Sequence, residues 1–142
     1  GAGHVIGTDI NLEATVNSIY NSEKLGYKNN FDSRLVPLSS PGAFVVIEKH
    51  ETFDLIISNP PWFEGKPKTI EEYAVYDSEY KLLYSLIDGL DRHLKKNGKA
   101  WLEIGSYDAL DVIKQEAEKR NLKVKFLLSQ GYQYSILEIS KK

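Results

Sequence analysis

The sequence predicts an α/β domain with a mostly parallel sheet that closes on an antiparallel pair of strands. Strand-like and helix-like segments alternate along the 142 residues, which is typical of a parallel sheet with covering helices. Residues 53–58 (FDLIIS) are a short apolar run bounded by polar residues, as expected for a strand buried on both faces. The last two strand-like segments, 124–128 and 134–139, are joined by a short loop containing Gly131. A connection this short makes them antiparallel.

The first third of the chain predicts a strand, a helix and a second strand. Residues 4–8 (HVIGT) form a β-branched strand that ends on Asp9. A helix follows over 11–25, where Asp9 or Asn11 can cap the start and Gly26 the end. Residues 34–38 (RLVPL) predict the second strand, weakened by Pro37, which donates no ladder hydrogen bond. A turn follows at Ser39, Ser40, Pro41 and Gly42, and residues 43–48 fit a strand or a short helix.

The remainder predicts a loop, two helices and a further strand. Residues 63–77 predict a long irregular loop, and 78–94 predict the strongest helix, ended by Asn97-Gly98. Residues 100–104 (AWLEI) predict a strand, and 108–120 predict a helix. The apolar residues of the first helix recur at helical spacing: Leu82, Leu83, Leu86, Ile87, Leu90 and Leu94.

Composition limits the function classes. The length suits a single domain spanning residues 1–142. With 18 basic and 20 acidic residues, the formal net charge is −2. The chain as a whole therefore lacks the excess of basic residues that is typical of nucleic-acid-binding proteins. There is no cysteine, and the three histidines lack ligand spacing, so no metal site is expected. No apolar run approaches the roughly 18 residues that span a bilayer. The sequence therefore predicts a cytoplasmic protein that does not insert into membranes.

The sharpest chemical signal is DLIISNPPWF, residues 54–63, in which the buried strand ends directly on Asn59-Pro60-Pro61-Trp62. Ligands of open α/β sheets bind beyond the carboxyl ends of the strands. Asn59 offers a carbonyl acceptor, and the two prolines fix the direction of the main-chain carbonyls. Two such acceptors can hold both hydrogens of a planar NH₂ group, and Trp62 offers a flat face for stacking. A rigid turn after a strand is the alternative interpretation.

The second signal is VIGTDIN, residues 5–11. An acidic residue at the tip of a strand can accept both ribose hydroxyls of an adenosine group, and Ile10 can pack on the adenine. Asp9 can equally serve only as a helix cap. The Asn59 strand further along the chain favours the ribose role.

These segments resemble the class I S-adenosylmethionine-dependent methyltransferases of the Asn-Pro-Pro-aromatic type. That group includes release-factor glutamine methyltransferases and several RNA and DNA amino-group methyltransferases. The resemblance covers most of the chain and implies a Rossmann-like, three-layer fold with S-adenosylmethionine as cofactor. It implies that Asp9 binds the ribose, that Ile10 contacts adenine, and that Asn59 with Pro60 holds the target amino group. Leu38 and Ser39 would border the adenine.

Two features depart from this family. The family usually has an acidic residue near the end of the third strand, whereas residues 35–42 here read LVPLSSPG. Either Ser39 substitutes for that acid, or its contact with the adenine amino group is lost. Its glycine-rich first strand and loop, with the following helix, are missing, because only Gly1-Ala2-Gly3 precedes the Asp9 strand. The chain also contains no methionine. We expect a natural protein with about 30–60 further N-terminal residues, or a homodimer that exchanges a strand between copies.

Three functions can be considered for a chain with these residues. The first is methyl transfer to a planar nitrogen of a nucleobase or of a protein glutamine. The net negative charge argues mildly against a nucleic acid substrate, and the choice between nucleic acid and protein stays open. The second is a catalytically incomplete, methyltransferase-like fragment or partner-binding module. A dinucleotide-dependent oxidoreductase is disfavoured by the closing antiparallel pair and by Asn59-Pro60-Pro61.

Overall fold

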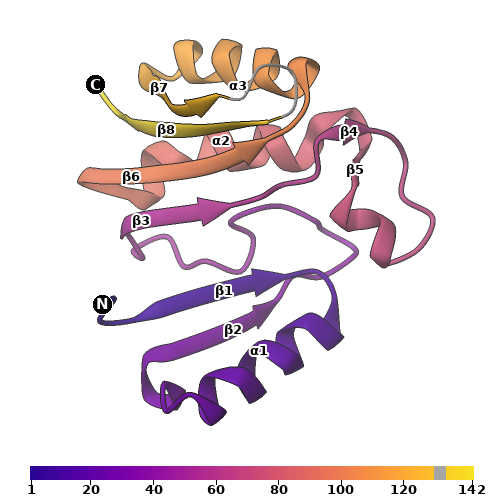
Figure 1. Ribbon diagram of the computed structural model, residues 1–142, viewed down its shortest axis with the longest axis vertical. Coiled ribbons are helices and arrows are strands. Elements are labelled where there is room, and N and C mark those ends of the chain that lie inside the picture. The colour runs from indigo at the N-terminus through magenta and orange to yellow at the C-terminus, as the bar shows by residue number, and fades with distance from the viewer. Residues whose placement is uncertain (130–133) are drawn as a thin grey trace. The chain divides into compact units, whose positions relative to one another are not determined.

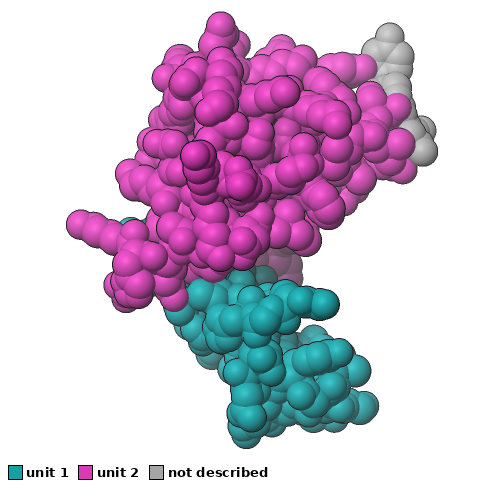
Figure 2. All heavy atoms as spheres, turned by 90° about the vertical axis from the view of Figure 1, so that its left-hand side faces the viewer, with its two compact units in different colours: residues 1–46 teal, residues 47–142 magenta. Residues whose placement is uncertain are grey.

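The structure, a computed structural model, describes residues 1–129 and 134–142. It divides into two compact units, residues 1–46 and residues 47–142 (Figure 2). The loop predicted at Gly131 lies outside the described residues. In the part of the chain that is described, no helix combines the length and apolar character needed to cross a membrane.

The first unit is a parallel strand pair joined through a helix (Figure 1). Strands β1 (Val5–Asp9) and β2 (Phe31–Leu35) pair in register from Val5 opposite Phe31 to Asp9 opposite Leu35. Helix α1 (Leu12–Lys24) and the short 3₁₀ helix η1 (Lys28–Asn30) connect them. A Cβ atom on Gly7 would lie 3.1 Å from the Phe31 ring, so a larger residue here would require the ring to shift slightly.

Both ends of α1 are closed by local hydrogen bonds, as the sequence predicts. Asn11 is the N-cap, and its side chain accepts from the Glu13 backbone N–H at 2.9 Å. At the other end Gly26 adopts φ 81°. Its N–H donates to the Glu23 carbonyl while the Tyr27 N–H donates to the Ser22 carbonyl. This pattern is a Schellman motif, which satisfies carbonyls that the last helical turn leaves unpaired.

Two predictions in this unit need correction. The second strand lies at Phe31–Leu35 and not at 34–38, because pairing with β1 fixes its register and because Pro37 cannot extend the ladder. Residues 43–48 form neither a strand nor a helix but successive turns. Their β-branched side chains lack a neighbouring strand with which to pair.

The second unit contains a four-stranded sheet in the order β3-β6-β8-β7. Strand β3 (Phe53–Ser58) runs parallel to β6 (Leu94–Ile104). Strand β8 (Ser135–Lys141) is antiparallel both to β6 and to β7 (Leu122–Ser129). The predicted antiparallel closure of the sheet is therefore confirmed.

One face of this sheet forms the core together with helices α2 (Lys81–His93) and α3 (Tyr107–Lys119), which contact each other (Figure 1). Side chains along β6 alternate, with Ala100, Leu102 and Ile104 buried and with Lys99 and Trp101 exposed. The predicted apolar stripe of α2 is confirmed at Leu83, Leu86, Ile87 and Leu90, whereas Leu94 is buried as the first residue of β6. The largest fully buried side chains come from both layers: Leu83, Ile87, Leu90, Leu94, Leu102, Ile113, Leu137 and Ile139.

Strand β6 begins earlier than predicted. Helix α2 stops at His93 and the strand starts at Leu94, so Asn97-Gly98 lies inside a strand and does not end the helix. The pairing of β3 with β6 shifts between Phe53 and Leu55, which accommodates extra residues on β6 as a bulge. A Cβ on Gly98 would meet the Phe53 carbonyl oxygen at 2.5 Å, so the bulge requires glycine at this position.

The predicted loop after Trp62 contains short regular elements. Strands β4 (Phe63–Glu64) and β5 (Tyr76–Asp77) pair in parallel, separated by the 3₁₀ helix η2 (Glu71–Ala74). A further 3₁₀ turn, η3 (Ser78–Tyr80), leads into α2. The buried Asp77 carboxylate accepts from the Leu82 and Leu83 N–H groups, each at 3.0 Å, and so caps α2. Burial raises the pKa of Asp77, against the opposing effect of these hydrogen bonds.

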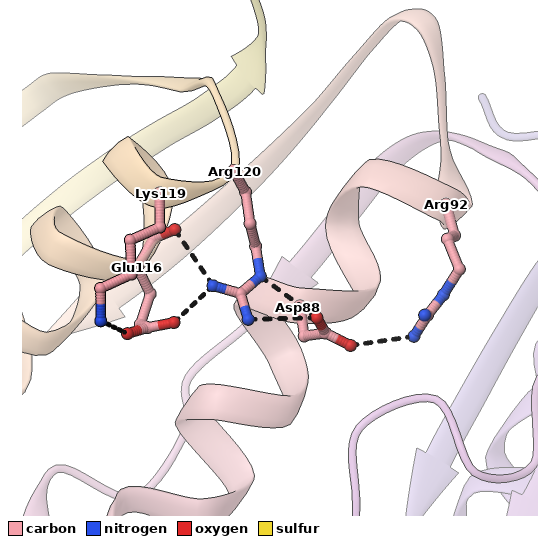
Figure 3. Close-up of polar contacts among 5 residues, drawn as sticks. All are labelled: Asp88, Arg92, Glu116, Lys119 and Arg120. Carbon is pink, nitrogen blue, oxygen red and sulfur yellow. Dashed lines mark hydrogen bonds and ion pairs between the residues drawn. The ribbon is translucent and has the colours of Figure 1, made fainter.

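An ion-pair network joins α2 to the end of α3 (Figure 3). Arg120 donates to Asp88 on α2 at 3.1 and 3.2 Å, and it also pairs with Glu116 on α3. Only 8% of the Glu116 side chain is exposed. Hydrogen bonds from Lys119 and then Arg120 hold the pKa of Glu116 below its ordinary value of 4.5, although burial acts in the opposite direction.

We expect Arg120→Ala to lower the free energy of unfolding by about 1.5–3 kcal/mol, the usual size of a hydrogen bond to a charged group. Arg92 is the matched control, since Asp88 is its one ion-pair partner among the described residues and 65% of its side chain is exposed. Arg92→Ala should cost less than about 1 kcal/mol. Urea denaturation of both variants measures the difference, and equal costs would contradict a bridging role for Arg120.

The same network predicts a dependence on pH. Because the pKa of Glu116 is lower in the folded chain than in the unfolded chain, its contribution to stability is present above pH 4.5 and is lost as pH falls through the folded value. The difference in free energy of unfolding between the native chain and Arg120→Ala should therefore become smaller at acidic pH. Denaturation curves at pH 7 and at a pH of about 3 test this expectation.

Candidate functional site

In the first unit, the predicted cofactor residues follow the carboxyl ends of the two parallel strands. Asp9 ends β1 and Ile10 comes next, while Leu38 and Ser39 lie shortly after the end of β2. The Val36 N–H donates to the Asp9 carbonyl at 2.8 Å, which ties the two strand ends together. Asp9, Leu38 and Ser39 are exposed, and Ile10 is half-buried. The structure thus brings all four residues to one end of the strand pair.

The Asp9 side chain has both a local role and spare acceptor capacity. One carboxylate oxygen accepts from the Asn11 N–H at 2.8 Å, which shapes the turn before α1, whereas the N-cap itself is Asn11. A carboxylate offers about four acceptor positions on two oxygens. The turn uses one of them, so the exposed Asp9 retains the capacity to accept a pair of hydroxyl groups.

In the second unit, Asn59 directly follows the last residue of β3. Its side chain is exposed, whereas Pro60 and Pro61 are buried. Buried prolines fix the backbone dihedrals immediately after Asn59. Asn59 is therefore a polar group presented to solvent on a rigid support, at the strand end where α/β sheets bind their ligands.

Trp62 connects this loop to the end of the neighbouring strand β6. Its indole Nε1–H donates to Asn59 Oδ1 at 3.1 Å and to the Glu103 carbonyl at 3.1 Å. The Phe63 ring lies next to it, with 6.4 Å between ring centroids. The stacking face predicted for Trp62 stays a prediction, and the structure adds a hydrogen-bonding role for its N–H group.

Gly105, directly after β6, is a part of this site that the sequence analysis missed. A Cβ atom there would lie 2.3 Å from Cζ3 and 2.5 Å from Cε3 of Trp62. The benzene half of the indole therefore occupies the space that any other side chain at this position would fill. A glycine directly after a buried strand was the only available signal, and it does not reveal which side chain fills the space.

Two further polar residues, Tyr80 and Ser106, contact each other close to the end of β6. Tyr80 forms a hydrogen bond with Ser106, the N-cap of α3, and adopts φ 54°. Burial first, and then the charges of Asp108 and Glu64, raise the pKa of the Tyr80 phenol. Nothing in the local sequence indicated that Tyr80 and Ser106 would meet. Over residues 1–129 and 134–142, no group of three His, Cys, Asp or Glu side chains is placed to hold a metal ion.

Two features indicate the class of fold. The first unit is a parallel strand pair with an acidic residue at the tip of β1. The second unit has a sheet that ends in an antiparallel pair, with Asn-Pro-Pro directly after the parallel strand β3. The chain has the α/β fold of class I methyltransferases, as its solved structural neighbours show. One is the ribosomal protein L11 methylase of Lactobacillus delbrueckii subsp. bulgaricus, with a TM-score of 0.69 and 22% identity over 100% of this chain and 60% of that chain. A methyltransferase from Pyrococcus furiosus has a TM-score of 0.63 and 25% identity over 98% of this chain and 64% of that one.

Two other comparisons extend this result. The N-terminal domain of human METTL16, solved in complex with SAH, has a TM-score of 0.67 and 16% identity over 97% of this chain and 52% of that chain. In sequence, the chain is 30% identical over 131 residues to the ribosomal protein L11 methyltransferase of Lactobacillus johnsonii, strain CNCM I-12250 / La1 / NCC 533. That match covers 92% of this chain but only 33% of the relative. No protein-family model matches the chain.

Proposed function

We propose that this chain is part of an S-adenosylmethionine-dependent methyltransferase that acts on a planar amino or amide nitrogen. The observation that carries the proposal is the exposed Asn59 amide, mounted on two buried prolines at the carboxyl end of β3. The class I methyltransferase fold of the structural neighbours supports it. The sequence relative at 30% identity is named as a methyltransferase as well.

The residues of the first unit suit the adenosine part of the cofactor. Asp9 has acceptor capacity left for two ribose hydroxyls, because the turn before α1 occupies only one position on its carboxylate. Ile10 offers an apolar surface to adenine, and Leu38 and Ser39 follow the neighbouring strand at the same end of the pair. When bound, S-adenosylmethionine supplies an electrophilic methyl group on a sulfonium that is already a good leaving group.

In the second unit, Asn59 and Pro60 would hold the acceptor. Asn59 Oδ1 receives one hydrogen bond from Trp62 and, with two lone pairs, can accept a second from a target N–H. The Pro60 carbonyl would take the other hydrogen. Accepting both hydrogens turns the nitrogen lone pair out of conjugation and exposes it to the methyl group. The N–CH₃ bond would form as the S–CH₃ bond breaks and the neutral thioether leaves. The nitrogen, positively charged and strongly acidic after methylation, would then release one N–H proton to water, so that catalysis rests on orientation and needs no general base of unusual pKa.

The acceptor is either a nucleobase amino group or a protein glutamine amide. The names of the neighbours point both ways, since one concerns ribosomal protein L11 and another a complex of human METTL16 with an RNA hairpin. The chain spans about a third of the length of its sequence relative. The activity and the substrate of the whole protein are therefore part of this proposal. A cytoplasmic location, a single domain and a homodimer also remain predictions.

Calorimetry with S-adenosylmethionine, on this chain and on the full-length protein, tests the proposal. It is combined with transfer of tritiated methyl to an adenine-rich RNA, the corresponding DNA and a glutamine-containing peptide. We expect binding by the full-length protein and labelling of one of these acceptors. If neither protein form binds the cofactor, the methyltransferase proposal is wrong. A partner-binding module is then the better description of this fold.

A further inference from the structure

The Trp62 indole is held at both ends of its ring system, and this constrains its neighbour Asn59. Its N–H is shared between Asn59 Oδ1 and the Glu103 carbonyl, both at 3.1 Å. Its benzene half lies against Gly105, where a Cβ atom would approach to 2.3 Å. Trp62 therefore spans from the loop after β3 to the end of β6, and it contacts the amide group that the proposed function assigns to the acceptor.

We propose that Trp62 is a positioning residue, which fixes the orientation of the Asn59 side-chain amide, and that Gly105 is the residue that admits it. This inference rests on the proposed function, in which Asn59 holds the target nitrogen. Phenylalanine at position 62 could stack equally well but has no N–H to donate. The hydrogen bond thus gives a reason for tryptophan that stacking alone does not.

The orientation follows from donor and acceptor chemistry. An asparagine side chain carries a carbonyl on one side and an NH₂ group on the other, and the two are similar in size. Rotating Asn59 by half a turn would bring its NH₂ group against the Trp62 N–H, so that two donors would face each other. The Trp62 bond therefore keeps the carbonyl oxygen on the side of β6, with one lone pair left for an acceptor hydrogen.

The consequence for catalysis is a preorganised acceptor group. Asn59 is exposed. Without a partner such as Trp62, an exposed asparagine side chain would rotate freely, and each substrate that binds would have to restrict that rotation. Groups that are already aimed at the reacting atoms cost no reorganisation during the reaction. Trp62 would then act on the rate through Asn59, without touching the methyl group itself.

The first test measures the mobility of Asn59 directly, by ¹⁵N relaxation of its side-chain Nδ2 group in the 142-residue chain. We expect an ordered amide in the native chain, with an order parameter near 0.85, and one below about 0.6 in Trp62→Phe. Gly105→Ala, which displaces the ring, should have the same effect. The matched control is Trp101→Phe, since Trp101 is the other of the 2 tryptophans and donates to Glu138 at 3.2 Å.

The second test is a double-mutant cycle on methyl transfer, in full-length protein, with the RNA, DNA or peptide that the tritium assay labels. Trp62→Phe should lower kcat roughly 10-fold while leaving the affinity for S-adenosylmethionine unchanged. In the Asn59→Ala background, the same substitution should change kcat by less than about twofold, because two residues that act through one contact are not additive.

The two tests separate this inference from the proposed function. If Asn59 is equally ordered in the native chain and in Trp62→Phe, or if the two substitutions are additive in kcat, Trp62 does not act through Asn59 and the inference fails. That outcome leaves the methyltransferase proposal standing. If no acceptor is labelled, the proposed function fails, while the order parameters still decide whether Trp62 positions Asn59.

Discussion

Asn59→Ala is expected to lower the rate of methyl transfer by roughly 100-fold or more, the usual cost of removing one preorganised polar contact to a reacting group. The substitution removes the carbonyl oxygen that would accept an N–H of the target nitrogen. It leaves the buried Pro60 and Pro61 in place, so the fold of the loop should persist. Because the predicted cofactor residues lie in the first unit, the affinity for S-adenosylmethionine should change by less than about twofold.

Asn97→Ala is the control for this prediction. Asn97 is an exposed asparagine on β6, and its replacement removes the same chemical group elsewhere in the second unit. Transfer of tritiated methyl and calorimetry are measured on both variants of the full-length protein. Asn59→Ala with a normal transfer rate would remove Asn59 from the catalytic site, whatever the affinity for the cofactor.

The second large effect is expected at Asp9, where two substitutions separate two roles. Asp9→Asn keeps one oxygen to accept the Asn11 N–H, which lies 2.8 Å from the carboxylate in the native chain. It removes the charge that would bind the ribose hydroxyls. Hydrogen bonds to a charged group contribute about 1.5–3 kcal/mol. The affinity for S-adenosylmethionine should therefore fall roughly 10- to 100-fold, with stability nearly unchanged.

Asp9→Ala removes the turn contact as well. It should weaken cofactor binding to a similar extent and also reduce the free energy of unfolding by about 1 kcal/mol, the usual net value of one hydrogen bond. Glu13→Gln is the charge control, because Glu13 is an exposed acid in the first turn of α1. Calorimetry and urea denaturation are the measurements. An equal loss of affinity in Glu13→Gln would show that only net charge matters.

Much of the candidate site could be predicted because strand ends are visible in a sequence. The run 53–58 ends on Asn59, and the structure places β3 over those same residues. Likewise the β-branched run before Asp9 became β1. Since ligands of α/β sheets gather at carboxyl strand ends, locating the strands was sufficient to locate the candidate residues within each unit.

Where the predictions were wrong, the deciding partner was distant in the chain. Residues 34–38 have the apolar character of a strand, but pairing with β1 selected Phe31–Leu35 instead. Asn97-Gly98 has the local chemistry of a helix end. It lies in β6 because β3 pairs with that strand on both sides of it, at Leu94 and at Lys99. Strand register depends on the partner strand, and a single segment does not contain that information.

The sequence by itself determined the class of fold, the helical stripe of α2, the antiparallel end of the sheet and the position of Asn59, because these follow from periodicity and turn chemistry within short segments. Only the tertiary structure decided that Trp62 bonds to the Glu103 carbonyl, 41 residues away, and that Arg120 reaches Asp88, 32 residues away. Residues so far apart in the chain meet only after the strands and helices have packed. Their pairing depends on the three-dimensional arrangement of the backbone, which no local pattern of residues specifies.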